Sequence, residues 1–127
     1  MRKDREGPVI KRLQKLFKDI KRNTFLFDGT KYKPDLVLRD SKDNNIIKAI
    51  IEVEGRGRRK MVGGVITADY CMGIEKQKPI MFVIALDKSD EKDYQKRIPM
   101  LEHYTKNLKE IVIRDKKHII SRLKEIH

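Results

Sequence analysis

Three carboxylate residues, Asp35, Glu52 and Glu54, lie on two neighbouring apolar stretches of the chain, residues 35–39 and 46–54. These stretches are rich in Val, Ile and Leu and flank a polar cluster, so the sequence predicts a β-hairpin. A turn centred in the polar cluster puts Asp35 across from Glu52, and alternation along the strand turns Glu54 to the same side as Glu52. Carboxylates that face one another repel, so such a cluster is held together by neighbouring cations or by a bound metal ion.

A glycine-rich basic loop, residues 55–60, follows the carboxylates directly and contains Arg56, Arg58, Arg59 and Lys60. Its glycines allow sharp backbone turns, and its four cations produce a local positive field. One interpretation is an ordinary ion network at the end of a strand, in which these cations neutralise the carboxylates. The other is a site whose cations contact an anionic substrate.

The first element expected to support this hairpin is an amphipathic helix over residues 8–22. Its apolar residues recur at helical spacing, and its initial proline suits the first turn of a helix. The opposite face is basic and carries Lys11, Arg12, Lys15, Lys18 and Arg22. This face is either a solvated surface or a phosphate-binding surface.

The remaining elements follow from apolar periodicity and turn residues. Asp28-Gly29 ends a short strand, and Pro99 kinks or splits a helix that begins near Glu91. Continuous apolar runs in the hairpin and beyond it indicate a sheet covered by helices on both faces. The elements predicted besides the first helix and the hairpin are a strand at 24–27, a helix at 60–72, a strand at 79–86, a helix at 91–107, a strand at 110–113 and a helix at 116–126. The order αβββαβαβα predicts one α/β domain over residues 1–127.

Two glycines, Gly63 and Gly64, interrupt the helix predicted at 60–72, although each costs about 1 kcal/mol relative to alanine. A close approach between this helix and the sheet is a reason to accept the cost. Gly73 is the expected cap at the end of the helix. The single cysteine, Cys71, excludes an intramolecular disulfide and is expected to be a buried apolar residue.

The charge of the chain indicates a polyanionic partner. It has 31 Lys and Arg against 19 Asp and Glu, a formal net charge of +12. Nucleic acid is the commonest partner of such a protein. A lysine-rich surface of the kind found in heat-adapted proteins explains many charges of both signs, but it does not explain the imbalance. The chain has no apolar stretch of membrane-spanning length and no signal-peptide core near Met1, so we expect a cytoplasmic protein without a membrane partner.

The hairpin motif resembles the PD-(D/E)XK nuclease superfamily. The matching residues are Pro34-Asp35 on one arm and Glu52-Val53-Glu54 on the other, within an αβββαβ order that covers about the first two thirds of the chain. The resemblance implies a restriction endonuclease-like αβββαβ core, a mixed sheet flanked by helices, with a C-terminal αβα extension. It also implies that Asp35 and Glu52 hold Mg²⁺ or Mn²⁺, an ion that supports phosphodiester hydrolysis.

The third-strand motif departs from the family pattern, because Glu54 stands where the family has a lysine. Some restriction endonucleases of the superfamily look similar, and their likeness implies that Glu54 is a third ligand or a base for the attacking water. The positive charge then comes from Arg56 and Lys60, which follow the strand. Lys48 shares the predicted face of Glu52 but lies about 13 Å away along the strand.

The resemblance implies further residues on the helices. Many family members have an acidic residue near the first helix that reaches the metal through water, and Glu6 is the candidate here. Its spacing from Leu13 looks like that in archaeal Holliday-junction resolvases. Asp69 and Tyr70, on the helix after the basic loop, face either the site or solvent.

Together these features predict a Mg²⁺-dependent endonuclease that hydrolyses DNA, with RNA not excluded as a substrate. One site makes one nick, so cutting both strands requires a homodimer, for which the C-terminal helix is a candidate surface. The alternatives are a nuclease-fold protein that binds nucleic acid without cutting it, and an unrelated basic α/β protein. The residues expected to contact nucleic acid are Lys11, Arg12, Lys15, Arg56, Arg58, Arg59 and Lys60.

Overall fold

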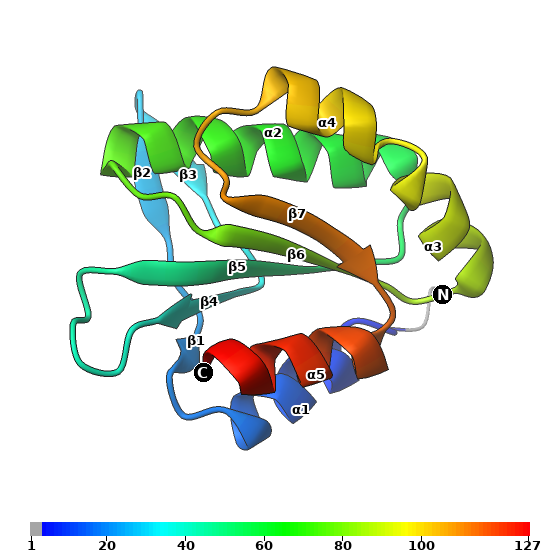
Figure 1. The fold of residues 1–127 in the computed structure, drawn as a ribbon, viewed down its shortest axis with the longest axis horizontal. Helices are drawn as coiled ribbons and strands as arrows, with labels where there is room; N and C mark the ends of the chain where they lie inside the picture. Colours follow the sequence, from blue (N-terminus) through cyan, green and yellow to red (C-terminus); the bar gives the residue numbers. More distant parts are fainter. Residues whose placement is uncertain (1–3) are drawn as a thin grey trace.

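A mixed five-stranded sheet with the strand order β1-β4-β5-β6-β7 forms the centre of the molecule in the computed structural model (Figure 1). The structure describes residues 4–127, so the first three residues of the predicted 1–127 domain lie outside the described residues. β1, β4 and β5 are antiparallel neighbours, whereas β5, β6 and β7 run parallel. The five strands are Ile20–Lys21 (β1), Leu36–Arg39 (β4), Ile47–Glu54 (β5), Ile80–Ala85 (β6) and Glu110–Arg114 (β7).

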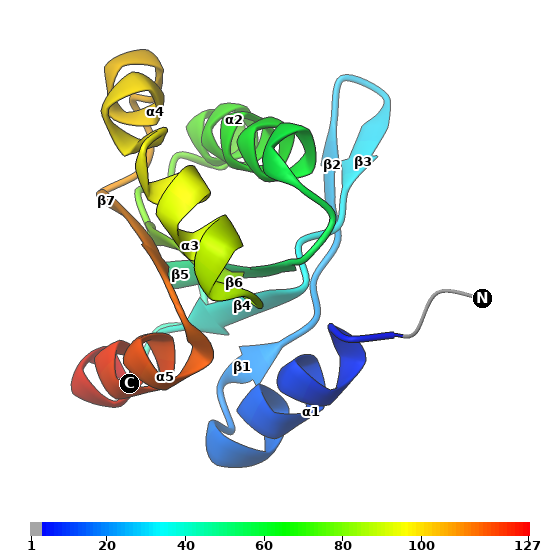
Figure 2. The same ribbon diagram turned by 90° about the vertical axis from the view of Figure 1, so that its right-hand side faces the viewer.

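Helices cover both faces of this sheet, as the continuous apolar runs predict (Figures 1 and 2). α1 (Gly7–Leu16) and α5 (Lys116–Ile126) pack on one face, and α2 (Arg58–Glu75), α3 (Lys88–Gln95) and α4 (Ile98–Tyr104) pack on the other. Every residue of β6 is buried, because this strand has neighbours on both sides and helices above and below. The chain is a single α/β domain. No helix within residues 4–127 is both long and apolar enough to cross a membrane.

The register of the central hairpin agrees with the prediction at its open end. Leu36 pairs with Ile51 and Val37 with Ile50, so the preceding residue, Asp35, lies beside Glu52. Near the turn the register shifts, and Lys48 is the extra residue of a β-bulge. The bulge interrupts the alternation of side chains, and the Lys48 ammonium donates to the carbonyl of Ile126 at the end of α5. The prediction that Lys48 shares the face of Glu52 is therefore wrong.

The N-terminal helix is shorter than predicted. α1 ends at Leu16, and Phe17 adopts an extended conformation. Ile20 then pairs with Leu38 of β4, so β1 provides hydrogen-bond partners for the backbone of β4. Phe17 and Ile20 are both buried, so their apolar spacing fits the observed turn as well as a longer helix. Lys18 and Arg22 consequently lie outside the basic face of α1.

A small hairpin arm projects beside α2 (Figure 2). Its strands are Phe25–Phe27 (β2) and Thr30–Tyr32 (β3), which pair with each other and not with the main sheet. Asp28 and Gly29 have φ values of 46° and 74°, the left-handed conformations that a two-residue hairpin turn requires. The Asp28-Gly29 turn agrees with the prediction, whereas β3 was not predicted. The strand predicted at 24–27 therefore lies in the arm, and the first strand of the main sheet is β1, which falls within the range predicted as helix; without the arm, the observed order is α1, β1, β4, β5, α2, β6.

Two helix boundaries differ in detail from the predictions. The helix predicted at 91–107 is split into α3 and α4, and Pro99 is the second residue of α4, where its missing N–H costs nothing. α2 continues past Gly73, and Lys76 is its left-handed C-cap with a φ of 56°. Gly73 instead packs against Asn107 in the loop after α4, because a Cβ there would lie 2.7 Å from the Asn107 amide nitrogen.

Candidate functional site

The residues predicted to do chemistry converge on one open pocket of about 370 Å³ at the carboxyl end of β5. Asp35 enters from the start of β4, Glu52 and Glu54 come from β5, and α1 contributes its N-cap. The basic loop and the first turn of α2 supply the cations. The charged residues that line the pocket are Glu6, Lys33, Asp35, Glu52, Glu54, Arg56 and Lys60. All but Lys33 were expected from the sequence.

The carboxylates of Asp35 and Glu52 each accept one hydrogen bond from the backbone of the opposite strand. The Asp35 N–H donates to Glu52 Oε1 at 2.7 Å, and the Val53 N–H donates to Asp35 Oδ2 at 2.7 Å. These bonds close the hairpin beyond its last strand pair and fix both carboxyl groups. Within the described residues, Asp35 Oδ1 and Glu52 Oε2 have no hydrogen-bond partner. One oxygen of each carboxyl group is thus left for a ligand.

The two other carboxylates also accept backbone hydrogen bonds. Glu54 Oε1 accepts from the Arg56 N–H at 2.7 Å, which curves the chain at the end of β5. Glu6 is the N-cap residue of α1, and its Oε2 accepts from the Gly55 N–H at 3.3 Å. The helix body begins after Glu6, yet this side chain reaches the pocket from the opposite layer of the molecule.

The carboxyl groups of the pocket are held in surroundings that disfavour their charge. The pKa of Glu52 is raised to about 8, chiefly by burial. The Asp35 N–H opposes this rise, and the nearby carboxylates of Asp35, Glu54 and Glu6 contribute to it. Burial likewise raises the pKa values of Asp35 and Glu54, although the hydrogen bonds from Val53 and Arg56 oppose the rise. A cation in the pocket would relieve this repulsion.

Tyr32 of the hairpin arm is a site residue that the sequence analysis missed. Its hydroxyl is buried and has no hydrogen-bond partner within the described residues. Burial, followed by the charge of Glu52, raises the pKa of this hydroxyl well above its usual value. An unused donor therefore lies next to the carboxylates. Recognition of the Asp28-Gly29 turn as a complete hairpin would have aligned Tyr32 with buried Phe25.

The close packing of α2 against Glu52 explains why position 64 is a glycine. A Cβ at this position would lie 3.3 Å from Glu52 Oε2, so the helix approaches the carboxylate closely only because glycine is present. A Cβ at Gly63 would meet no atom within 4 Å. The predicted close approach between helix and sheet is thus confirmed for Gly64 and is wrong for Gly63.

The other predicted residues lie away from the pocket. Arg58 pairs with Asp93 of α3 at 3.6 Å, and Arg59 is exposed at the start of α2. Lys11 and Lys15 are exposed on α1. Arg12 lies in a groove beside α5. Asp69 accepts hydrogen bonds from the N–H groups of Lys106 and Asn107. Tyr70 donates a hydrogen bond to Asp28.

Within residues 4–127, no group of three or more acidic, histidine or cysteine side chains is arranged as a metal-binding cluster. Each of the four carboxylates of the pocket turns one oxygen towards a backbone N–H. The donor set itself fits a hard divalent cation, since carboxylate oxygens are the ligands that Mg²⁺ and Mn²⁺ prefer. The free oxygens of Asp35 and Glu52 are the groups that could hold such an ion.

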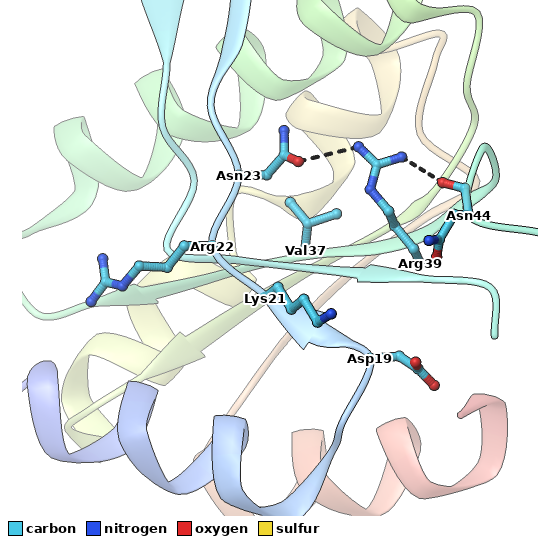
Figure 3. A pocket seen from close by; sticks show the side chains of 7 residues that line it. All are labelled: Asp19, Lys21, Arg22, Asn23, Val37, Arg39 and Asn44. Atoms are coloured by element: carbon cyan, nitrogen blue, oxygen red, sulfur yellow. Dashed lines mark hydrogen bonds between the residues drawn. The ribbon is translucent and has the colours of Figure 1, made fainter.

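A second pocket, of about 120 Å³, lies where β1 meets β4 and has a structural role (Figure 3). Arg39 bridges it by donating to Asn23 Oδ1 at 3.2 Å and to the Asn44 carbonyl at 2.8 Å. These bonds connect the turn of the central hairpin to the segment between β1 and β2. Since its guanidinium is already engaged on both sides, we assign no ligand to this pocket.

Comparison of the chain with protein-family models, curated proteins and solved structures found no significant match. The carboxylate pocket is therefore the main guide to function.

Proposed function

We propose that the protein is a metal-dependent endonuclease that hydrolyses phosphodiester bonds in DNA. The observation that carries the proposal is the pair of hydrogen bonds from the Asp35 N–H to Glu52 and from the Val53 N–H to Asp35, which fixes two carboxyl groups side by side with one free oxygen each. The order α1, β1, β4, β5, α2, β6 agrees with a restriction endonuclease-like core. The strongly positive charge of the chain favours a nucleic acid substrate.

Asp35 and Glu52 would hold the Mg²⁺ or Mn²⁺ ion, with Glu6 contacting it through water. When bound, the ion polarises a phosphoryl oxygen and lowers the pKa of a water molecule. Glu54, at the edge of the same pocket, orients that water or accepts its proton.

Arg56 and Lys60 replace the positive charge of the family's lysine. Both line the pocket, where they stabilise negative charge on the phosphate. Arginine remains protonated and does not act as a base, so the role of Arg56 is electrostatic. Lys33 adds a third cation from the segment before Asp35.

The substrate-binding surface extends from the pocket over exposed cations. Arg59 lies close to the pocket in sequence, and Lys11, Arg12 and Lys15 form the exposed basic side of α1. Arg58 contributes less in this proposal, because it is already paired with Asp93. RNA presents the same phosphates and is the second substrate to test.

A homodimer would allow both strands of a duplex to be cut. The outer side of α2 carries three exposed side chains without charge, Ile66, Tyr70 and Ile74, each one helical turn from the next. In α5, by contrast, Ile119 and Leu123 are buried in the core. The outer side of α2 is therefore the better candidate for the dimer surface, and sedimentation equilibrium tests the assembly.

A nuclease-fold protein that binds nucleic acid without cutting it is the second candidate function. It is favoured by Glu54 in place of the family's lysine and by the carboxylates being turned onto backbone N–H groups. This candidate predicts salt-sensitive binding to DNA and no products with any divalent metal.

The experiment that separates the two candidates is incubation of the pure protein with supercoiled and branched DNA. Mg²⁺ and Mn²⁺ are compared with a chelator, and the Asp35→Asn variant serves as a control for contaminating nuclease. Metal-dependent products that disappear in the variant support the endonuclease. Binding without products supports the second candidate.

A further inference from the structure

A basic groove of about 440 Å³ lies between α1 and α5, apart from the carboxylate pocket. Both helices pack on the same face of the sheet and lie side by side (Figures 1 and 2). Leu16 and Ile120 contribute apolar surface to the groove. Its cations are Arg12, Lys116, Lys117 and Lys124.

The charges of this basic groove are uncompensated. All four cations are exposed, and no carboxylate lines the groove. Among the described residues, none of the four forms an ion pair. The neighbouring Arg122 differs, since it pairs with Glu110 at 3.0 Å. Four cations gathered without counterions repel one another, so the groove favours an occupant that carries several negative charges.

The two helices that form the basic groove start at the end of the sheet where the carboxylate pocket lies. α1 starts directly after Glu6, whose carboxylate accepts from the Gly55 N–H of the pocket. α5 starts two residues after Arg114, the last residue of β7. Through the strand pairing, Arg114 is level with Ile84 of β6 and with Val53 of β5, so the start of α5 lies at the same end of the sheet as the pocket. Both helices therefore lead away from the pocket across one face of the sheet.

We propose that the basic groove binds a run of phosphates on the nucleic acid beyond the bond that occupies the carboxylate pocket. This inference rests on the proposed function for its choice of polyanion. α5 has 11 residues, a length of about 16 Å, and one strand of a duplex carries one phosphate per about 3.4 Å of duplex axis, so a duplex lying along α5 places roughly four to five phosphates of one strand beside it. The groove thereby sets the direction in which the substrate leaves the pocket.

This assignment has a consequence for substrate length. Contacts in the basic groove add affinity only for a nucleic acid that extends past the pocket onto the α1 and α5 face. A short substrate confined to the pocket does not use them. An acidic protein segment is the competing occupant, and it differs because it has no reason to bind the carboxylate pocket at the same time.

The test compares two variants that lose the same charge in different places. The groove variant is Arg12→Gln, Lys116→Gln, Lys117→Gln and Lys124→Gln. The control variant changes four exposed lysines outside both pockets and outside ion pairs of the described residues: Lys31→Gln, Lys42→Gln, Lys78→Gln and Lys106→Gln. Thermal unfolding of both variants checks that the fold is retained.

Affinity for a labelled duplex, long enough to span the pocket and the groove, is measured over a range of salt concentrations in chelator. Each lost phosphate contact lowers the slope of log K against log salt by about 1, so the groove variant is expected to lose about 4 and the control variant less than 1. For a duplex limited to the pocket, we expect the two variants to bind equally.

Equal losses in both variants on the long duplex would overturn the proposal. Tighter binding of polyglutamate by the wild type than by the groove variant, with unchanged DNA binding, would assign the groove to an acidic protein partner. Because binding is measured without metal, this result is independent of cleavage. Failure of the proposed nuclease activity appears instead as absent products in wild-type protein.

Discussion

Asp35 and Glu52 hold each other in place through the backbone. The Asp35 N–H donates to Glu52 Oε1, and the N–H of the residue after Glu52 donates to Asp35 Oδ2, each at 2.7 Å. The residues that we propose as metal ligands also close the open end of the central hairpin. The same two hydrogen bonds therefore set both the geometry of the site and the register of the hairpin. A substitution that tests the site must remove the charge of a carboxylate while keeping its hydrogen bond.

Asp35→Asn and Asp35→Ala separate these two roles. Asparagine retains an oxygen that accepts from the Val53 N–H, so we expect cleavage to be lost with the free energy of unfolding nearly unchanged. Alanine leaves that partly buried N–H unpaired, which costs about 1–3 kcal/mol in addition to the loss of cleavage. Urea unfolding and plasmid nicking measure the two effects. Wild-type cleavage by the asparagine variant would refute the role of Asp35.

The stability of the metal-free protein is expected to fall as pH rises. The pKa of Glu52 is about 8 in the folded chain and 4.5 in its unperturbed state, so the unfolded chain loses this proton first. The free energy of unfolding therefore decreases from about pH 4.5 to about pH 8 and then levels off. Asp35 and Glu54 act in the same direction, because their pKa values are also raised.

Glu52→Gln provides the control for this pH dependence. Its amide oxygen still accepts from the Asp35 N–H, but the side chain no longer ionises. Urea unfolding across the same pH range is expected to show a smaller decrease in stability than in the wild type. Identical pH profiles for the two proteins would show that Glu52 does not titrate in the folded state as described.

Gly63 and Gly64 offer a matched pair of alanine substitutions in α2. Gly63→Ala meets open space, so the better helix propensity of alanine raises the free energy of unfolding by about 1 kcal/mol without effect on cleavage. Gly64→Ala brings a methyl group to 3.3 Å from Glu52 Oε2 and displaces that carboxylate. We expect at least a tenfold loss of cleavage, about 1.4 kcal/mol in the activation barrier. Equal cleavage by both variants would contradict the close approach.

Tyr32→Phe tests the unused hydroxyl beside Glu52. The hydroxyl lies beside Glu52 but forms no well-aligned hydrogen bond in the described part of the chain, so its removal is expected to change the free energy of unfolding by less than about 1 kcal/mol. Cleavage is expected to fall, since the hydroxyl is a donor for water or substrate in the neighbouring pocket. Single-turnover cleavage and urea unfolding give the two values. Lower stability with unchanged cleavage would show instead that the hydroxyl bonds to the protein.

The register of the central hairpin could be predicted because apolar residues and a polar turn both constrain it. The convergence of Asp35, Glu52 and Glu54 follows from that register alone. The bulge at Lys48 could not be predicted, since no residue type there marks where the strand gains a residue. The side chain of Lys48 donates to the carbonyl of Ile126 at the end of α5, which is distant in sequence.

The N-terminal segment shows a different limit of sequence patterns. Phe17 and Ile20 continue the helical spacing of α1. Ile20 nevertheless pairs with β4 and belongs to β1, the edge strand of the sheet. The positions of Tyr32 beside Glu52 and of Arg12 beside α5 likewise depend on packing between segments. Local periodicity contains no information about such neighbours.

The central claim is that Asp35 and Glu52 bind a divalent cation for cleavage. Its most direct test is calorimetric titration of Mn²⁺ into the wild type and into the Asp35→Asn, Glu52→Gln double variant, with nicking of supercoiled DNA followed in parallel. Both substitutions keep an oxygen for the backbone hydrogen bonds, so the fold is retained while the charge is removed. We predict Mn²⁺ binding and nicking by the wild type and neither by the variant. Equal binding by the two proteins, or nicking by the variant, would contradict the account.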